Sequence, residues 1–349
     1  MSNIKKYAFM KEKLNKSNKD KPLTIFITGG SSGIGYQAVL KLISLGHNII
    51  LPCKNILRAN QVLTMIFNQL PCELSRKGNI YTPIMDLSDL KSIDSLCSEI
   101  KKKRMYIDVL ILNAGLQYTG SKKPMRSTQG IELTFAVNHL SHFYLTQNLL
   151  PFINRSNDSK IVITSSEVHN PMSSGGRVGA KAGLGNLLGL ASGEAFEMID
   201  GNKFNADKAY KDSKLCNILF AKELHARLRK QNLSIQVITW APGLVISRDR
   251  QGFFRYSQKY NQLGQLLFSF LARDILKITT SNERAGLLLS QLSSLSEYND
   301  SNFSYYSNKI ISPGKFIFEK STISKEAQEE GLPNKLWVLS DSLIHKIIS

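Results

Sequence analysis

Short apolar runs rich in β-branched residues alternate along the chain with longer segments in which apolar positions recur at helical spacing. Runs of the first kind are typical of parallel strands, because helices cover both faces of a parallel sheet. Seven strands are expected, at residues 23–28, 48–53, 80–85, 107–112, 160–164, 235–239 and 302–306. Helices are expected near 35–45, 57–69, 88–102, 130–152, 208–228, 282–295 and 336–347, with Ser88 as the N-cap of the third. This alternation predicts an α/β fold, with a single domain built on a Rossmann-type doubly wound parallel sheet.

Two segments interrupt the alternation. Residues 170–206 form a glycine-rich insertion, and a long insertion beside the edge of a sheet is typical of a functional cover. Residues 245–278 are amphipathic and carry an aromatic cluster. They predict either a helical flap over a substrate pocket or a basic, aromatic surface that contacts a membrane. Residues 1–22, which are polar and lysine-rich, are expected to form a flexible basic arm ahead of a dinucleotide-binding domain at 23–349.

Composition and charge indicate which kinds of molecule the protein binds. A net charge of +18 over 349 residues would suit nucleic acid or an anionic membrane, but the positive charge is scattered and no nucleic-acid motif is present. A basic protein that binds an anionic cofactor, with no nucleic-acid partner, is therefore favoured. The four cysteines include no Cys-x-x-Cys pair, residues 1–22 lack an apolar signal region, and no run of 18 apolar residues is present. We therefore expect a reducing, cytoplasmic location, at most peripheral to a membrane.

A glycine-rich turn follows the first strand. The strand ends at Thr28, and Gly29, Gly33 and Gly35 follow in a G-x-x-x-G-x-G spacing. Glycines let a backbone approach a pyrophosphate closely, and the N-terminus of the next helix carries the positive end of the helix dipole. A tight turn of small residues is the alternative. We disfavour it, because strand, glycine turn and helix together are the context that a dinucleotide requires.

The cofactor is expected to be NADPH. NAD enzymes of this architecture place a carboxylate near the end of the second strand, where it bonds the ribose 2′-hydroxyl. This chain has no acid there and carries Lys54 instead, which would suit a 2′-phosphate. A solvated lysine is the alternative for Lys54, so the missing acid is the stronger half of this inference.

The candidate chemistry centres on Tyr210 and Lys214. Their spacing of four residues puts a phenol and an ammonium on one face of a helix. The ammonium is expected to lower the tyrosine pKa from about 10 toward working pH, so that Tyr210 can transfer a proton. Most pairs of this kind are ordinary surface neighbours, so the rest of the chain must support the assignment. Four polar residues follow strands and would gather at one edge of the sheet: Thr28, Asp86, Asn113 and Ser166.

Two histidines raise the question of a metal site. His139 and His142 share a helix face within the segment 130–152 and could bind a metal ion. No third ligand of suitable spacing accompanies them, so packing or capping roles are favoured and no metal site is expected.

The ordered set formed by these motifs resembles that of the short-chain dehydrogenase/reductases, over about residues 23–310. Its members are Thr28-Gly29-x-x-x-Gly33-x-Gly35, Asn113-Ala114-Gly115, Asn138, Ser166 and Tyr210-x-x-x-Lys214. The resemblance implies an NADP-dependent oxidoreductase in which Tyr210 donates the proton and Lys214 holds the nicotinamide ribose and tunes Tyr210. It also implies that Ser166 orients the reacting group and that Asn138 supports a proton-relay water.

The same resemblance implies a set of cofactor-binding residues. Asp86 would meet the adenine, and Asn113 would lie on the adenosine side of the cofactor. The full set is Thr28, Gly29, Ser31, Ser32, Gly33, Ile34, Gly35, Lys54, Asp86, Leu87, Asn113, Ala114, Gly115, Tyr210, Lys214, Pro242 and Gly243.

Within this family the chain is most similar to the light-dependent protochlorophyllide reductases. The similarity lies in residues 183–204, in residues 208–217 and in Lys335-Leu336-Trp337-x-x-Ser340. It implies light-driven hydride transfer from NADPH to a tetrapyrrole double bond, chlorophyll biosynthesis and, in a photosynthetic cell, a thylakoid surface. Peripheral membrane contact and a homo-oligomer are both compatible with the sequence.

Two departures from that branch keep other functions open. Ala241 and Leu244 stand where the branch has a tyrosine and a cysteine that are implicated in pigment placement, and Ser166 replaces the usual threonine. The second hypothesis is therefore a dark carbonyl/alcohol reductase on a large apolar substrate, similar to the retinol dehydrogenases. The third, a non-catalytic nucleotide- or pigment-binding protein, is disfavoured because it would not need Tyr210.

Overall fold

The computed structural model describes residues 22–70, 78–156, 158–193, 196–246, 256–260 and 262–348. The arm predicted for residues 1–22 lies outside this part of the chain except for its last residue, as do residues 247–255 and 261 of the predicted flap. The chain is built on an eight-stranded sheet of order β3-β2-β1-β4-β5-β6-β7-β8. Seven strands are parallel, and β8 pairs with β7 in the antiparallel sense. The doubly wound, mostly parallel sheet predicted from the sequence is therefore confirmed.

The strands are short, and β4 and β5 are buried along their whole length. Their bounds are β1 Thr24–Ile27, β2 Asn48–Ile50, β3 Ile80–Tyr81, β4 Val109–Leu112, β5 Lys160–Thr164, β6 Gln236–Ala241, β7 Ser304–Ser312 and β8 Lys315–Lys320. The prediction that the sheet ends with a strand at 302–306 is wrong. The strand β7 runs on to Ser312, and a turn at Gly314, with φ +70°, returns the chain as β8.

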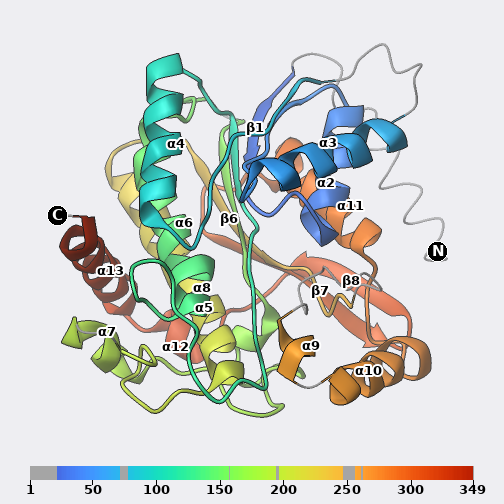
Figure 1. The fold of residues 1–349 in the computed structure, drawn as a ribbon, viewed down its shortest axis with the longest axis vertical. Helices are drawn as coiled ribbons and strands as arrows, with labels where there is room; N and C mark the ends of the chain where they lie inside the picture. The colour runs from blue at the N-terminus through green and yellow to red at the C-terminus, as the bar shows by residue number, and fades with distance from the viewer. Residues whose placement is uncertain are drawn as a thin grey trace.

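Helices cover both faces of the sheet (Figure 1). The helices α2 (Gly33–Ser44), α3 (Ile56–Gln69) and α11 (Asn282–Ser294) lie on one side, and α4 (Leu90–Lys103), α6 (Ser141–Leu149), α8 (Ala206–Lys230) and α13 (Leu332–Ile348) lie on the other. Each layer buries a separate apolar cluster against the sheet. No helix in the described part of the chain is both long and apolar enough to cross a bilayer.

The segment predicted as one helix at 130–152 is divided into four. It contains α5 (Leu133–Phe135), a π-helical turn at Ala136–Leu140, α6 and a 3₁₀ turn at Leu150–Phe152. A π-helical turn inside a helix often lies at a functional site, and this one contains Asn138. The cap predicted for α4 is also wrong, because the side chain of Asp89 accepts the capping bond from Lys91 N–H, while Ser88 bonds Asp86.

The insertion and the flap lie at the same end of the molecule (Figure 1). The insertion contains a 3₁₀ turn (Gly185–Leu187) and α7 (Leu188–Ser192). The flap contains α9 (Ser257–Tyr260), α10 (Gln262–Phe270) and a π-helical turn (Leu271–Ile275), and it lies beside the hairpin of β7 and β8. The remaining short helices are 3₁₀ turns at Glu167–His169 and Ser296–Tyr298, and α12 (Lys325–Gln328).

Candidate active site

The predicted glycine turn forms a close-packed cradle between β1 and α2. Gly29 has φ +66°, and a Cβ atom on it would lie 2.7 Å from Cα of Ala114. A Cβ atom on Gly35 would lie 2.3 Å from the carbonyl oxygen of Gly29 and 2.7 Å from Nδ2 of Asn113. By contrast, a Cβ atom on Gly33 would meet only Asn282, at 3.7 Å, but its φ of +56° still favours glycine. Any side chain at Gly29 or Gly35 would therefore displace the turn.

The N-terminus of α2 is well suited to an anion. Ser32 is its N-cap, yet no side-chain hydrogen bond caps the helix and no acidic residue lies in its first turn. The N–H groups and the positive end of the dipole therefore have no acidic side chain competing for them. Ser31 and Ile34 lie in the same turn, so the structure brings these predicted cofactor residues together at one helix end.

Thr28 ties the turn to the next strand. Its Oγ1 accepts hydrogen bonds from the N–H groups of Asn113 and Ala114, both at 3.0 Å. Nδ2 of Asn113 donates to the carbonyl oxygens of Thr28 at 3.3 Å and Gly29 at 3.4 Å. The ends of β1 and β4 therefore form one surface beside the glycine cradle, as the sequence predicts.

Two cations lie near the end of β2. Lys54 Nζ lies 3.0 Å from Oδ2 of Asp86, so the structure joins two predicted cofactor residues in an ion pair. Burial raises the pKa of Asp86, but hydrogen bonds from Ser88 and the contact with Lys54 outweigh it and leave that pKa below its usual value. The second cation, Arg58, was missed by the sequence analysis, and it donates to the carbonyl oxygen of Ser31 at 2.6 Å.

These features suit NADPH as the cofactor. The cradle admits a pyrophosphate because Cβ atoms would fill it, and the uncapped N-terminus of α2 offers N–H donors. Arg58 links the glycine turn to the end of β2, where Lys54 adds a second positive charge. A 2′-phosphate matches two cations better than a 2′-hydroxyl does. Arg58 could have been predicted as a phosphate-binding residue from its position four residues after Lys54, in the first turn of α3.

Tyr210, Lys214 and Ser166 lie together, with Tyr210 and Lys214 on α8 and Ser166 just after β5. The hydroxyl of Tyr210 is hydrogen-bonded to the side chain of Ser166. Lys214 Nζ lies 5.7 Å from the centre of the Tyr210 ring and donates to the carbonyl oxygen of Thr164 at 3.2 Å. The predicted shared helix face is therefore confirmed.

The predicted lowering of the tyrosine pKa is wrong. Burial raises the pKa of Tyr210 above its usual value, and the hydrogen bond with Ser166 offsets only part of that rise. Burial also lowers the pKa of Lys214 to about 8. Both shifts favour the neutral form, because a buried site penalises charge on either group. At neutral pH Tyr210 is consequently protonated.

Asn138 is fixed in the π-helical turn beside this group. Its side chain accepts from Leu116 N–H at 2.8 Å, donates to the Leu116 carbonyl oxygen at 2.9 Å and donates to Ser213 Oγ at 3.0 Å. A Cβ atom on Gly115 would lie 3.4 Å from both Oδ1 of Asn138 and Nζ of Lys214. The side chains of Asn138 and Lys214 therefore both lie close to Gly115.

The two candidate metal ligands have different surroundings. His142 has a protein partner at each ring nitrogen, Thr28 Oγ1 at 2.9 Å and the carbonyl oxygen of Asn138 at 3.2 Å. His139 lies in an aromatic cluster and pairs with Ser340 Oγ at 3.2 Å. In the described part of the chain, no three His, Cys, Asp or Glu residues are grouped so that they could hold a metal ion.

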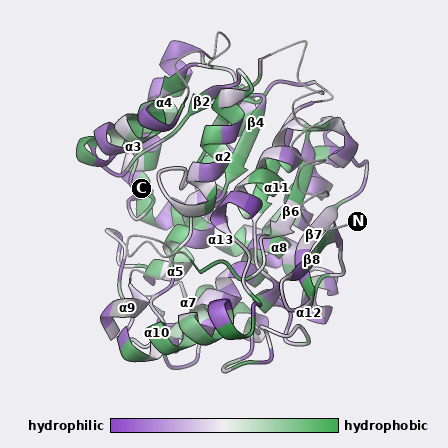
Figure 2. Ribbon diagram, turned by 90° about the vertical axis from the view of Figure 1, so that its right-hand side faces the viewer, coloured by the Kyte–Doolittle hydropathy of each residue, from purple (hydrophilic) through white to green (hydrophobic). Residues whose placement is uncertain are grey.

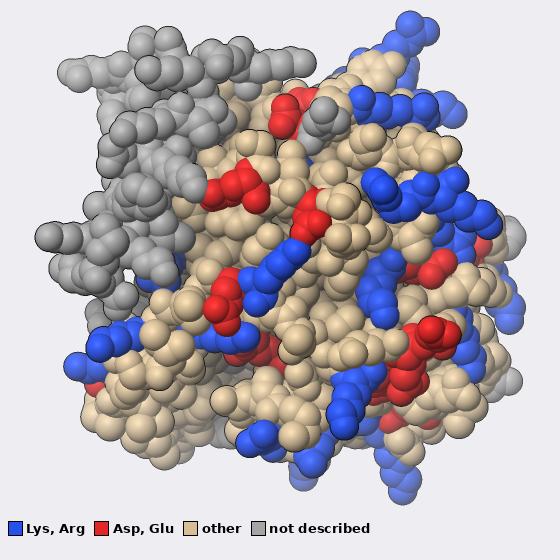
Figure 3. Space-filling view, turned by 180° about the vertical axis from the view of Figure 1, so that it is seen from behind, with Lys and Arg blue, Asp and Glu red and all other residues tan. Residues whose placement is uncertain are grey.

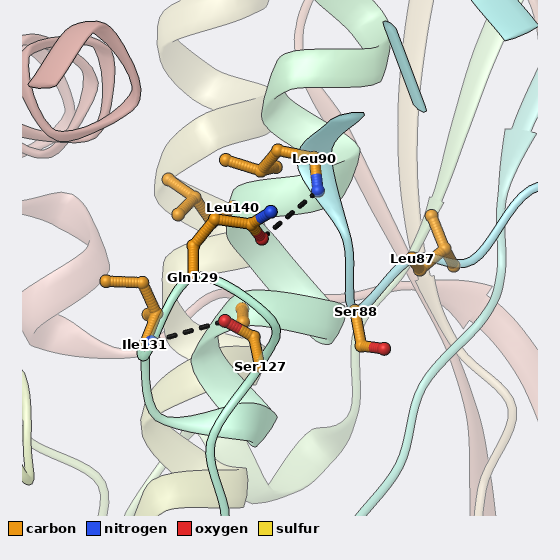
Figure 4. A pocket seen from close by; sticks show the side chains of 8 residues that line it. Leu87, Ser88, Leu90, Ser127, Gln129, Ile131 and Leu140 are labelled. Carbon is orange, nitrogen blue, oxygen red and sulfur yellow. Dashed lines mark hydrogen bonds between the residues drawn. The ribbon is translucent and has the colours of Figure 1, made fainter. Parts of the chain in front are cut away.

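Pro242, Gly243 and Leu87 are the remaining predicted cofactor residues. The carbonyl oxygen of Pro242 accepts from Nδ2 of Asn308 at 2.9 Å, and Gly243 has φ +82°. Leu87 lines a cavity of about 10 Å³ under the loop of Ser127 and Gln129 (Figure 4). That volume matches about one water molecule, so this cavity is not a cofactor or substrate site.

Positive charge does not form one continuous stripe on the face shown in Figure 3. Lys and Arg side chains are spread over it and are interspersed with Asp and Glu. The cations that matter for the site are therefore the local ones, Lys54, Arg58 and Lys214.

Comparison with known proteins agrees with this geometry. The family model for short chain dehydrogenase matches residues 23–194. Protochlorophyllide reductase B of Oryza sativa is 31% identical over 329 residues, which are 92% of this chain and 77% of that protein. The chain belongs to the short-chain dehydrogenase/reductase family of oxidoreductases. Its relatives over most of its length include the protochlorophyllide reductases, among them that of Avena sativa, which is 30% identical over 92% of this chain and 99% of that protein.

Solved structures share the fold. An uncharacterised protein of Mycobacterium paratuberculosis aligns with a TM-score of 0.64 at 21% identity, covering 94% of this chain and 97% of that one. L-sorbose reductase of Gluconobacter frateurii, solved with NADPH and L-sorbose, aligns with a TM-score of 0.58 at 16% identity, covering 84% and 98%. At these identities the likeness concerns the fold.

Proposed function

We propose that the protein is an NADPH-dependent oxidoreductase that reduces a tetrapyrrole double bond in a light-driven reaction, as protochlorophyllide reductases do. The observation that carries the enzymatic part is the hydrogen bond between Tyr210 and Ser166 beside Lys214. The pigment as substrate is supported by the relatives, which are about 31% identical along most of the chain. The insertion at 170–206 lies at the end of the molecule where α8 begins and would cover a large substrate.

Each residue has a role in this proposal. NADPH, when bound, would supply a hydride to one carbon of the double bond, and the other carbon would then take a proton. Tyr210, which burial keeps protonated at neutral pH, donates that proton while Ser166 orients the reacting group. Lys214 holds the nicotinamide ribose, and Asn138 supports a water that returns a proton to Tyr210. Lys54, Arg58 and the cradle from Thr28 to Gly35 bind the phosphates.

The proposal is tested by an assay in light and in darkness. Purified protein, NADPH and protochlorophyllide should give the absorption shift of chlorophyllide under illumination, with no shift in darkness. NADH in place of NADPH should be a poorer donor, because Lys54 and Arg58 would lose the 2′-phosphate. No shift above a protein-free control, with NADPH shown to be bound, would rule out the pigment as substrate.

A dark carbonyl/alcohol reductase with a large apolar substrate is the second candidate. Ser166, Tyr210 and Lys214 suffice for carbonyl reduction, and Ala241 and Leu244 replace the two pigment-associated residues of the branch. NADPH oxidation in darkness with a panel of apolar aldehydes, together with a silent pigment assay, would favour this candidate over the first.

We also propose that the flap contacts a membrane surface, a thylakoid if the cell is photosynthetic. None of the nine residues of α10 is buried, and its exposed fractions reach 83% at Leu263 and 61% at Leu267. Figure 2 shows this helix at the edge of the molecule with mainly apolar residues. Lys259 in α9 and Lys277 just after the π-helical turn are exposed, and Gly314, which precedes the exposed Lys315, donates its N–H to the carbonyl oxygen of Lys277. An apolar helix with cations at its margins suits an anionic lipid surface.

Binding to vesicles tests the membrane contact. Wild-type protein should sediment with vesicles that contain anionic lipid and less with zwitterionic ones, and Leu263→Glu with Leu267→Glu should reduce binding about tenfold or more. Leu57→Glu is the matched control, because Leu57 is 65% exposed on α3, remote in the sequence from the flap. Equal loss in both variants, or binding that ignores lipid charge, would contradict the proposal.

A further inference from the structure

His142 connects the cofactor turn to the π-helical turn. It lies near the start of α6, and its side chain is 1% exposed. One ring nitrogen, Nε2, lies 2.9 Å from Oγ1 of Thr28, and the other, Nδ1, lies 3.2 Å from the carbonyl oxygen of Asn138. A single buried ring therefore spans from the end of β1 to the residue beside Lys214.

The hydrogen bonds of Thr28 determine which nitrogen of His142 carries the proton. A hydroxyl has one hydrogen and two lone pairs. The N–H groups of Asn113 and Ala114 both donate to Oγ1 of Thr28 and occupy its lone pairs. The hydroxyl must then donate, and Nε2 of His142 at 2.9 Å is a nearer acceptor than the carbonyl oxygen of Ile111 at 3.4 Å.

The proton of His142 therefore resides on Nδ1. Nδ1–H donates to the carbonyl oxygen of Asn138, the middle residue of the π-helical turn. Burial lowers the pKa of His142 to about 3, so the ring stays neutral at working pH. The result is a directed chain of hydrogen bonds, from Thr28 through His142 to the backbone of Asn138.

These hydrogen bonds connect two parts of the site, the cofactor turn at Thr28 and the proton-relay residue Asn138. Thr28 holds Asn113 and Ala114 against the glycine cradle. Asn138 holds the backbone of Leu116, and a Cβ atom on the neighbouring Gly115 would lie 3.4 Å from both its side chain and Nζ of Lys214. A shift of the His142 ring would consequently move the phosphate cradle and the proton-relay group relative to each other.

We propose that His142 is a positioning residue that holds the cofactor turn and the carbonyl of Asn138 at a fixed position relative to each other. The role at Asn138 rests on the function proposed above, whereas the role at Thr28 concerns cofactor binding alone. His142 would touch neither the substrate nor the reacting atoms.

Two amide substitutions separate the two ends of the ring. In His142→Asn the amide lies where Nδ1 was, so it can still donate to the Asn138 carbonyl but no longer reaches Thr28. In His142→Gln the amide lies near the former Nε2, so it still accepts from Thr28 and loses the bond to Asn138. We expect His142→Asn to weaken NADPH binding about threefold to tenfold, measured by fluorescence titration. His142→Gln should retain NADPH affinity and lose about threefold to tenfold in turnover, with an altered pH profile.

The control is His139→Gln. His139 is a buried histidine of the same segment that pairs with Ser340 in the C-terminal helix and not with the cofactor turn. His139→Gln should lower the melting temperature without changing NADPH affinity. If both His142 variants and His139→Gln lower stability alike and leave NADPH affinity unchanged, His142 is merely structural and the proposal fails.

Thr28→Val and Thr28→Ser provide the same test from the other end, should a His142 variant fail to fold. Serine retains the hydroxyl that donates to Nε2 and accepts from Asn113 and Ala114 N–H, whereas valine removes all three bonds. We expect serine to restore most of the NADPH affinity that valine loses, and equal losses would overturn the proposal. Because these titrations need no substrate, they remain decisive if the pigment assay fails.

Discussion

Tyr210→Phe is expected to reduce turnover by about 10²- to 10⁴-fold while NADPH affinity changes little. The substitution removes the hydroxyl that hydrogen-bonds Ser166 and leaves the ring in place beside Lys214. Turnover is to be measured in single-turnover experiments at saturating NADPH, and affinity by fluorescence titration. Tyr106→Phe is the control, since it removes a hydroxyl from a side chain that is 56% exposed and should leave both quantities unchanged.

The protonation states give this prediction its pH dependence. Burial raises the pKa of Tyr210, so the acid form that a reduction requires persists through neutral pH. Burial lowers the pKa of Lys214 to about 8, so Lys214 loses its charge first as pH rises. A fall in turnover as pH rises through about 8 would therefore report Lys214 and not Tyr210.

Full activity of Tyr210→Phe in every assay would show that Tyr210 is not the proton donor. If neither the wild type nor Tyr210→Phe were active, the third hypothesis, a protein that binds a nucleotide or pigment without catalysis, would explain the glycine cradle and the cations. Loss of NADPH binding together with activity would instead indicate that Tyr210 supports the cofactor more than it supports proton transfer.

Local patterns account for the parts of the fold and site that the sequence predicts. The turn from Thr28 to Gly35 and the pair of Tyr210 and Lys214 each depend on residues within one turn or one helix, so their spacing is visible in the chain. The doubly wound parallel sheet follows from the repeated strand and helix pattern.

Contacts between distant segments account for the parts that were missed. The bond between Arg58 and Ser31 crosses 27 residues, and the bond between His142 and Thr28 crosses 114. The prediction for the pKa of Tyr210 failed for the same reason, since the burial that raises this pKa arises from the folded surroundings and outweighs the hydrogen bond with Ser166. The π-helical turn at Asn138 likewise carries no periodic signal of its own in a segment that reads as one helix.

Lys208→Ala is expected to destabilise the protein by about 3–5 kcal/mol, since it leaves two buried carboxylates without their cation. Lys208 Nζ lies 2.9 Å from Asp200 and 2.5 Å from Asp212, and it donates to the carbonyl oxygen of Gly183. The carboxylate side chains are 2% and 1% exposed, against 19% for Lys208. This cluster fastens the insertion to α8, so the loss should appear as a lower free energy of unfolding in urea.

The destabilisation caused by Lys208→Ala should increase as the pH rises. Burial raises the pKa of Asp212 from 3.8 to about 7, although Lys208 and the N–H of Gly183 lower it. A carboxyl with a raised native pKa binds its proton more tightly when folded, so stability falls as pH rises from about 4 to 7. Without Lys208 that pKa rises further, and the variant should be more destabilised at pH 8 than at pH 5.

Two controls distinguish a buried cluster from an ordinary ion pair. Lys309→Ala removes one partner of the exposed pair with Glu319 and should change stability by no more than about 1 kcal/mol. Adding Asp212→Asn to Lys208→Ala removes one uncompensated charge, and the amide oxygen can still accept from Gly183 N–H. The double variant should therefore be more stable than Lys208→Ala at pH 8. Equal destabilisation at both pH values, with no recovery in the double variant, would mean that packing of the lysine stem and not its charge holds the insertion against α8.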